Sequence, residues 1–454
     1  MLSCCVATLF AASAPAQPRE TEPPNPLIRK IADEISAKRI EANIRKLAGF
    51  GTRNTLSDTK SDTRGIGAAR RWIKSELDTC AKETGGRLQV AFDEHLAPVS
   101  RRIPQPTPIV NVVATLPGAQ AQSKDRIYVV SGHYDSMPSS PTDPEMDAPG
   151  ANDDASGTAA VMELACVMSK HEFDATLVFM AVAGEEQGLI GARFWAERAK
   201  KEGRNIAGMI TNDIIGNTKG FDGTVVKNRV RIFAEGVPAV NPLPDDIVAA
   251  LRTGGENDLP TRQLARFIKS AAERHVAGMQ VDLIYRRDRY LRGGDHIPFL
   301  ESGYPAVRFT EPNENWRHQH QNVRVEDGVQ LGDLPEFVDF EYTANVARVN
   351  AAALAALALG PAAPQQVEME NLRLENNTTL RWKANSEPDI AGYRIVWRET
   401  TSAFWQWSQD VGNMTRETIV GKSKDNFQFG VQAYDKHGNH SVVAYPKPYN
   451  PGRP

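Results

Sequence analysis

The chain has 454 residues, of which 41% are hydrophobic and 24% charged, a globular composition with enough length for a large core and a second domain. The 53 basic and 56 acidic residues give a net charge of −3, without a long run of Lys and Arg to follow a phosphate backbone. These features argue against a nucleic-acid partner. A membrane span is not expected either, because no segment beyond the N-terminus approaches about 18 uninterrupted apolar residues.

Residues 1–26 form a signal-like N-terminal segment. A short apolar stretch is followed by Ala-Pro-Ala before Gln17 and then by a polar, proline-rich tail. This pattern favours a secretory signal and export to the periplasm or the extracellular space. The usual basic start of such a signal is missing, which leaves three alternatives: a start codon assigned too late, a lipoprotein signal around Cys4 or Cys5, and a plain disordered tail.

Residues 27–361 alternate between helical and strand patterns. Apolar residues at helical spacing predict helices in "PLIRKIADEISAKRIEANIRKLAGFG" and "GAARRWIKSELDTCAKE". Further on, short apolar runs such as "PIVNVVATL", "DRIYVV", "ATLVFMAVA", "IAGMITN" and "PAVRF" alternate with helical stretches, and "PTRQLARFIKSAAERH" and "EYTANVARVNAAALAALALG" close the region. The alternation predicts an α/β domain with a mainly parallel sheet flanked by helices.

Two cysteines, Cys80 and Cys166, lie within this region. They could pair in an oxidising compartment, but they have no metal-site spacing. We expect them to be small buried apolar side chains rather than a disulfide.

After the linker "GPAAPQQ", residues 362–454 alternate polar and apolar residues in short runs and contain four of the seven tryptophans. This pattern predicts a small all-β sandwich domain.

Polar side chains stand directly after several predicted strands. His133 follows "DRIYVV", the adjacent acids Glu185 and Glu186 follow "ATLVFMAVA", and Asp213 ends the strand "MITN". Because ligands of open α/β sheets bind beyond the carboxyl ends of strands, we expect these side chains to converge. Two adjacent buried carboxylates cost free energy unless a cation compensates them, so the pattern favours a metal site.

Further acids and imidazoles extend this set. Asp153, at a helix start in "PGANDDASG", can bridge two cations about 3.5–4 Å apart, and Asp135 can accept a hydrogen bond from His133. His318 and His320 follow the strand "PAVRF". One His and one carboxylate per metal, with a shared Asp, suit zinc and leave room for water.

The two adjacent acids can have different roles. Successive side chains of an extended segment point different ways, so one acid can bind a metal while the other takes a proton from the attacking water.

The order "SGHYDS", "PGANDDASG", "GEEQGL", "NDIIG", "SGYPAVRFTE", "HQHQN" across roughly residues 40–360 resembles the M28 family of dinuclear zinc aminopeptidases. The stretch "ANIRKLAGFGTRNT" is similar to the N-terminal helix of that family. The resemblance implies two zinc ions per chain and hydrolysis of the N-terminal peptide bond of peptides or proteins. It also implies one role for each matching residue: zinc ligands His133 and Asp213, zinc ligands Glu186 and a late His, bridging ligand Asp153, general base Glu185, and Asp135 orienting His133.

The segment "GGDHIPFLESGYPA" is similar to an Asp-His element near the pocket of the family. It makes Asp295 and His296 candidates to lie behind the ligands, although an ordinary structural role is at least equally expected.

The last ligand departs from the family pattern, which has Tyr-His followed four residues on by Asp. Neither His318 nor His320 has an Asp at that offset, and Arg317 and Gln319 precede them. We favour His320 because its "QH" step resembles relatives with a longer motif, with His318 as the alternative. The missing Tyr leaves the oxyanion donor open, with Arg317 and Trp316 as candidates.

Two other functions are considered. A glutaminyl-peptide cyclotransferase shares the fold and the "DHIPF" stretch but works with one zinc, and a catalytically silent adhesion or receptor module would use the C-terminal domain. Retention of all presumed ligands argues against both.

The C-terminal residues resemble a fibronectin type III domain through "TLRWKAN", "GYRIVWRE" and "FGVQAYDKHGN". The resemblance implies that Trp382 and Tyr434 lie in its core and that the domain serves attachment or scaffolding.

The preferred N-terminal residue of the substrate cannot be read from the pocket loops. Arg286, Arg287 and Arg289 are expected to be solvated rather than to bind a substrate carboxylate.

Overall fold

A sheet of eight strands organises the larger part of the described chain, which in this computed structural model comprises residues 17–18 and 23–449. Of the signal-like segment 1–26, residues 1–16 and 19–22 lie outside the described residues. In spatial order the strands are β2 (Gln89–Ala97), β3 (Thr107–Leu116), β5 (Thr176–Val182), β4 (Arg126–His133), β6 (Asn205–Asn212), β9 (Ala306–Thr310), β7 (Arg229–Ala234) and β8 (Gln280–Ile284).

The centre of this sheet is parallel. Strands β5, β4, β6 and β9 run in one direction, whereas β3 pairs antiparallel with β5 and β7 pairs antiparallel with β9. The predicted α/β fold with a mainly parallel central sheet is confirmed. The edge strands β2 and β8, and β7 beside β8, were not predicted, because they are partly exposed and lack the continuous apolar runs of buried parallel strands.

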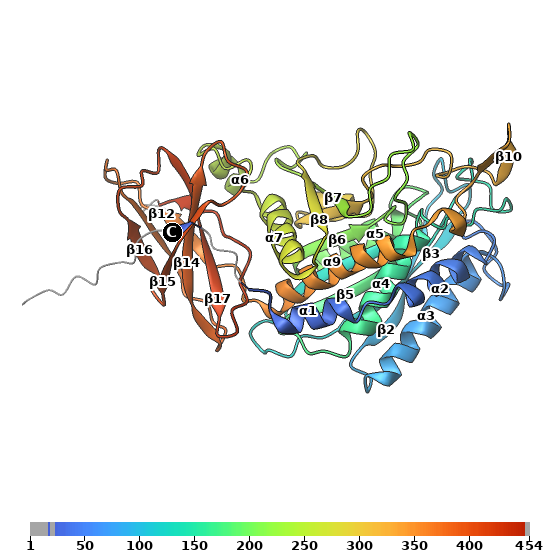
Figure 1. Cartoon of the computed structure of the whole chain (residues 1–454), viewed down its shortest axis with the longest axis horizontal. Coiled ribbons are helices and arrows are strands. Elements are labelled where there is room, and N and C mark those ends of the chain that lie inside the picture. The colour runs from blue at the N-terminus through green and yellow to red at the C-terminus, as the bar shows by residue number, and fades with distance from the viewer. Residues whose placement is uncertain (1–16, 19–22, 450–454) are drawn as a thin grey trace, which may run out of the picture.

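Helices cover both faces of the sheet (Figure 1). Successive strand residues point to opposite faces: Val130 and Phe179 belong to the larger core cluster, and Val129 and Val178 to the smaller one. The larger cluster packs under α1 (Pro26–Asp33), α2 (Ala37–Ala48), α3 (Gly65–Glu83), α4 (Ala155–Met168), α7 (Pro260–His275) and α9 (Phe340–Leu359), and the smaller under α5 (Ile190–Lys201) and α8 (His296–Glu301).

Within the described residues, no helix combines the length and the apolar character needed to cross a bilayer.

The C-terminal residues form two small β-sheets at one end of the molecule (Figure 1). One contains β14 (Ile390–Glu399), β15 (Trp407–Gly412), β17 (Phe427–Asp435) and the short β1 (Gln17–Pro18), and the other β12 (Gln365–Met369), β13 (Thr378–Lys383), β16 (Arg416–Ile419) and β18 (Lys447–Pro448). Smaller elements elsewhere are α6 (Asp245–Leu251), β10 (Arg324–Glu326), β11 (Val329–Leu331) and the 3₁₀ helix Pro335–Phe337.

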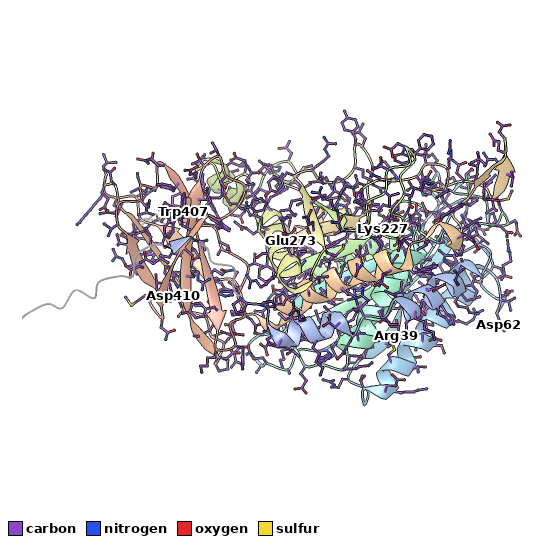
Figure 2. All side chains as sticks on the ribbon, in the orientation of Figure 1. Arg39, Asp62, Lys227, Glu273, Trp407 and Asp410 are labelled. Carbon is purple, nitrogen blue, oxygen red and sulfur yellow. A yellow bond between two sulfur atoms is a disulfide. The ribbon has the colours of Figure 1, made fainter. Side chains whose placement is uncertain are left out.

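Aromatic side chains fill the core of this C-terminal part. Trp397 is fully buried and stacks on Trp407, which Figure 2 shows on the sandwich. Trp382 is buried in the same core, as expected. Tyr434 is not a core residue: it lies half-buried, and its hydroxyl donates to Asp410, so the polar tip of the ring stays near the surface.

A buried ion cluster joins the two parts of the molecule. Asp258, just before α7, contacts Arg266 of α7 at 2.7 Å and Arg398 of β14, and all three side chains are almost completely buried. Trp405 lies beside both guanidinium groups. The C-terminal sheets therefore contact the α/β part through a shared charge as well as through apolar surface.

Cys80 of α3 and Cys166 of α4 form a disulfide, with their Cα atoms 5.2 Å apart. The expectation of two unpaired buried cysteines is therefore wrong. The two cysteines are 86 residues apart, and they meet only because α3 packs beside α4. No local sequence pattern predicts such a contact.

Removal of this disulfide is expected to lower the free energy of unfolding by about 3–4 kcal/mol, because the bond closes a long loop in the unfolded chain. Urea denaturation with and without a reductant measures the effect. The double variant Cys80→Ser/Cys166→Ser is the control and should not respond to the reductant. An unchanged wild-type midpoint under reducing conditions would contradict the pairing.

Candidate metal centre

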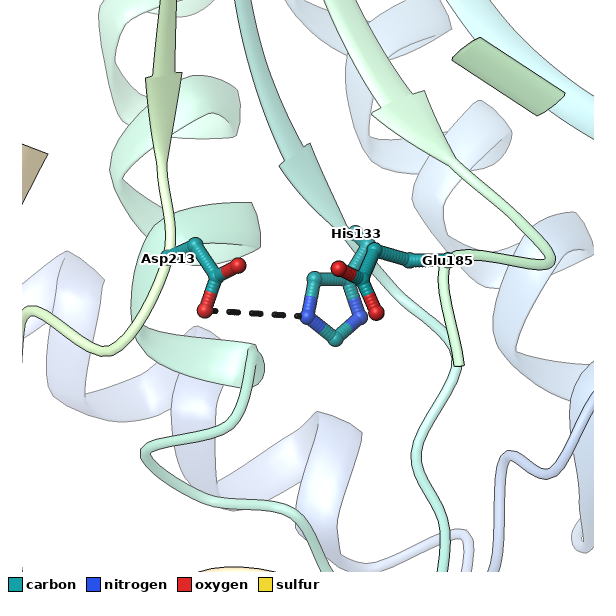
Figure 3. Close-up of side chains that lie close together, drawn as sticks. All are labelled: His133, Glu185 and Asp213. Carbon is teal, nitrogen blue, oxygen red and sulfur yellow. Dashed lines mark ion pairs between the residues drawn. The ribbon is translucent and has the colours of Figure 1, made fainter. Parts of the chain in front are cut away.

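Three neighbouring strands deliver their terminal side chains to one place. His133 ends β4, Glu185 and Glu186 follow β5, and Asp213 follows β6, and these strands lie adjacent in the sheet. Figure 3 shows Asp213 and Glu185 close to His133, and His133 Nε2 is 3.9 Å from Asp213 Oδ1. The convergence expected from the sequence is therefore present in the structure.

Asp153 lies between the two imidazoles of the site. Its Oδ1 is 3.1 Å from His133 Nε2, and its Oδ2 is 2.9 Å from His320 Nε2. Glu186 Oε2 is 3.2 Å from the same nitrogen of His320. Each oxygen of Asp153 therefore faces a different His, which is the placement a bridging carboxylate requires.

Two small residues let the Asp153 loop approach β4. A Cβ on Gly132, at the end of β4, would lie 2.4 Å from the backbone of Gly157, in the first turn of α4. Asp154 caps that helix by accepting from Gly157 N at 2.9 Å, and it also accepts from His133 N at 3.0 Å. Asp154 thereby fixes the start of α4 against the end of β4.

Asp333, which no sequence pattern predicted, holds Asp153 from the other side. Its carboxylate accepts from the backbone N–H of Asn152 at 2.9 Å and of Asp153 at 2.7 Å. Burial raises the pKa of Asp333 to about 7, although these donors and Arg53 oppose the shift. The position of Asp153 thus depends on a residue 180 positions further along the chain.

Asp135 contacts both halves of the site. Its carboxylate accepts from Glu186 N at 3.2 Å and from Thr55 Oγ1 at 3.1 Å, and its Oδ1 lies 3.5 Å from His133 Nδ1. The same Nδ1 is 3.1 Å from the backbone oxygen of Asp135. Asp135 is therefore placed to orient His133 and to hold the segment that carries the two glutamates.

Asp295 and His296 behave differently from each other. Both carboxylate oxygens of Asp295 are buried without a hydrogen-bond partner among the described residues, and burial raises its pKa to about 7. His296 lies further back: its Nε2 is 2.8 Å from Arg287 O and 3.4 Å from Asp288 Oδ2. The structure places His296 beside these groups rather than beside the proposed ligands.

Two buried arginines were also missed. Arg308, inside the strand β9, lies 2.8 Å from Asp213 Oδ1. Arg53, in the stretch "GTRNT", is fully buried and donates to the backbone oxygens of Tyr134, next to His133, and of Gly150, three residues before Asp153. Arg308 could have been found from the sequence, because it is a charged residue inside the apolar run "PAVRF".

His318 and His320 occupy different environments. The ring of His318 stacks on Phe337 with a centroid distance of 3.7 Å, and burial together with Arg317 lowers its pKa to about 4. His320 has a left-handed backbone, with φ of 52°, and its imidazole reaches Asp153 and Glu186. The structure brings His320, and not His318, to the carboxylates.

A cavity of about 300 Å³ opens at this centre, and Gln319 and His320 are among its lining residues. The described residues that line it include neither Arg317, which lies over Phe221, nor the half-exposed Trp316. The structure therefore gives no support to Arg317 or Trp316 as the oxyanion donor. Gln319 donates to Asp153 Oδ2 at 3.0 Å in the position where the family has Tyr.

The electrostatics of the centre suit cations. Burial and the neighbouring Asp213 and Glu186 raise the pKa of Glu185 well above its usual value, and Glu186 Oε1 is buried without a hydrogen-bond partner among the described residues. Ligand atoms within 4.8 Å of one another form two groups: His133, Glu185 and Asp213, and His133, Asp153 and Glu186. Mixed imidazole and carboxylate donors at this spacing fit zinc.

An α/β sheet that gathers buried imidazole and carboxylate groups at its strand ends defines a metal-dependent enzyme. The chain belongs to peptidase family M28, which residues 111–326 match. A probable zinc metalloprotease of Pyrenophora teres f. teres is 46% identical over 94% of this chain and 88% of its own length. The protein is thus a zinc metallopeptidase whose substrates are peptides.

Solved structures share the fold. The LapA aminopeptidase of Legionella pneumophila has a TM-score of 0.50 and 20% identity, over 72% of this chain and 74% of its own. A glutaminyl cyclase of Macrostomum lignano has the same TM-score and 15% identity, over 74% of this chain and 94% of its own.

Proposed function

We propose that the protein is an aminopeptidase with two zinc ions. The observation that carries this proposal is the placement of Asp153, whose two oxygens lie 3.1 Å and 2.9 Å from the imidazoles of His133 and His320. His133 and Asp213 would hold one ion, Glu186 and His320 the other, and Asp153 both. When bound, the ions would supply Lewis-acid chemistry by lowering the pKa of water and polarising the scissile carbonyl.

Glu185 would act as the general base. Its carboxylate lies close to His133 and Asp213, and burial with the neighbouring acids raises its pKa, which makes it a stronger base than an ordinary carboxylate. It would take the proton of the attacking water and pass it to the leaving amine. The surrounding carboxylates would hold the free α-amine of the substrate by opposite charge, which restricts cleavage to the N-terminal bond.

The main alternative is a glutaminyl-peptide cyclotransferase with one zinc, because a cyclase shares the fold. The presence of two His and three acids within ligand distance favours the two-ion site. A silent adhesion module is the other alternative, and a complete set of ligands disfavours it.

Metal analysis combined with activity assays tests the proposal. We expect two zinc ions per chain by elemental analysis, hydrolysis of aminoacyl-coumarin amides, and no hydrolysis of the same substrates after N-acetylation. A single zinc with ring closure of an N-terminal Gln peptide would establish the cyclotransferase. Absence of both metal and hydrolysis would favour the adhesion module.

We further propose export to the periplasm or the extracellular space, with a lipoprotein anchor as the alternative. The Cys80–Cys166 disulfide supports this, because disulfides persist in oxidising compartments. We also propose three parts of the chain: a signal-like segment at 1–26, the peptidase domain at 27–361 and the C-terminal domain at 362–454. The two C-terminal sheets support a fibronectin type III-like domain, with attachment to a surface or polymer as its proposed role.

A further inference from the structure

Three arginines line the cavity beside the proposed metal centre: Arg102, Arg289 and Arg292. Arg289 and Arg292 belong to the loop between β8 and α8, and Arg102 to the loop between β2 and β3. Arg102 donates to the backbone oxygen of Glu186, so its guanidinium lies against a proposed zinc-binding segment. Cationic groups therefore approach the centre from two separate loops.

A buried acid holds two of these arginines in place. Glu314 Oε2 is 2.8 Å from Arg292 Nη1 and 3.4 Å from Arg289 Nη1, and Glu314 Oε1 is 3.3 Å from Arg231 Nη2. One carboxylate thus contacts three guanidinium groups. Arg289 also donates to Asp288 and to Gly293 O.

The expectation that Arg289 is solvated is wrong, since its side chain is only 9% exposed. The apolar residues Tyr290 and Leu291, at the tip of this loop, are exposed, and so is Arg286. The loop therefore turns its apolar tip outward and Arg289 and Arg292 toward the cavity.

Glu314 does not neutralise the arginines that it holds, because one carboxylate faces three guanidinium groups. Asp288 lies between Arg289 and Arg308, and Glu314 faces Arg231, Arg289 and Arg292. The side chain of Arg292 makes one hydrogen bond to the described residues, through Nη1; its guanidinium lies 5.2 Å from the Trp316 ring centre, and the side chain is 32% exposed. Its other N–H groups remain available to a ligand in the cavity.

We propose that Arg289, Arg292 and Arg102 form a carboxylate-binding subsite that makes the enzyme prefer substrates with an acidic group close to the scissile bond. The proposal rests on the aminopeptidase function proposed above. A planar guanidinium binds a carboxylate through paired N–H donors, and the contacts with Glu314 fix two of the three before substrate arrives. The acidic group is either the side chain of an N-terminal Asp or Glu, or the C-terminal carboxylate of a dipeptide.

Matched coumarin amides of Asp and Asn, which have similar size and different charge, test the first source. We expect kcat/KM to be about tenfold or more higher for Asp, and we expect Arg292→Gln and Arg289→Gln to lower that ratio about tenfold. Arg286→Gln is the matched control, because Arg286 is an exposed arginine of the same loop that does not line the cavity. Its Asp to Asn ratio should stay at the wild-type value.

Binding of free L-aspartate and L-asparagine by calorimetry gives a readout independent of turnover, and the same preference should appear and weaken in Arg292→Gln. The dipeptide Leu-Leu against its C-terminal amide tests the second source. Preference for the carboxylate form in either pair, lost in Arg292→Gln, supports the subsite. Hydrolysis of Leu substrates without either preference overturns it and leaves the aminopeptidase function intact, whereas absence of all hydrolysis overturns the aminopeptidase function.

Discussion

Replacing Glu185 by glutamine is expected to reduce kcat by about 10²-fold or more while zinc content stays nearly unchanged. Glutamine keeps the size of the side chain and removes its ability to take a proton. If Glu185 is the base, the loss should appear in kcat, because the proton moves only as the reaction proceeds. Steady-state kinetics on an aminoacyl-coumarin amide, combined with elemental analysis of the same preparation, measure both quantities.

Glu197→Gln provides the control for this experiment, because Glu197 is an exposed acid on α5, a short distance further along the chain. It should retain the parental rate. A Glu185→Gln variant that also hydrolyses at the parental rate would show that the base is another group. Loss of zinc in that variant would instead make Glu185 a ligand, a role that its closeness to His133 and Asp213 makes worth testing.

The variant His320→Ala is expected to weaken zinc binding by at least about 10²-fold and to reduce turnover to a similar or greater extent. In the unmodified protein, His320 Nε2 lies 2.9 Å from Asp153 Oδ2 and 3.2 Å from Glu186 Oε2. Without the imidazole, the second zinc ion would keep only the ligands Asp153 and Glu186. Zinc titration against a competing chelator gives the affinity.

His318→Ala is the matched comparison, since it removes the same side chain two positions earlier in the same loop. It breaks the stack on Phe337 and should lower stability modestly, with zinc affinity close to that of the unmodified protein. The reverse result, with zinc lost in His318→Ala and kept in His320→Ala, would reassign the last ligand.

The sequence predicted the side chains that stand at the ends of buried parallel strands. His133, Glu185 and Asp213 follow apolar runs, and the rule that such ends meet at one edge of the sheet was enough to bring them together. The edge strands were not predicted, because one half-exposed face gives them a weaker pattern.

Residues that support the site through tertiary contacts were missed for a different reason. Asp333 and Arg53 act on the backbone of loops far away in the sequence, and no local pattern announces such a contact. The side-chain direction of His320 could not be read from spacing alone, since His318 follows the same strand. The Cys80–Cys166 pair likewise depends on helix packing.

The shared acid Asp258 makes the stability of each part of the molecule depend on the other. Exchange of the sandwich for an unrelated module would remove Arg398 and leave Asp258 with Arg266 alone, and it would uncover Gln263, which accepts from the indole of Trp405. Removing one partner from a buried ion cluster is costly, so an exchange would have to change the residues on both sides of this contact together. The C-terminal sheets therefore contribute to the stability of the peptidase part instead of forming an independent module.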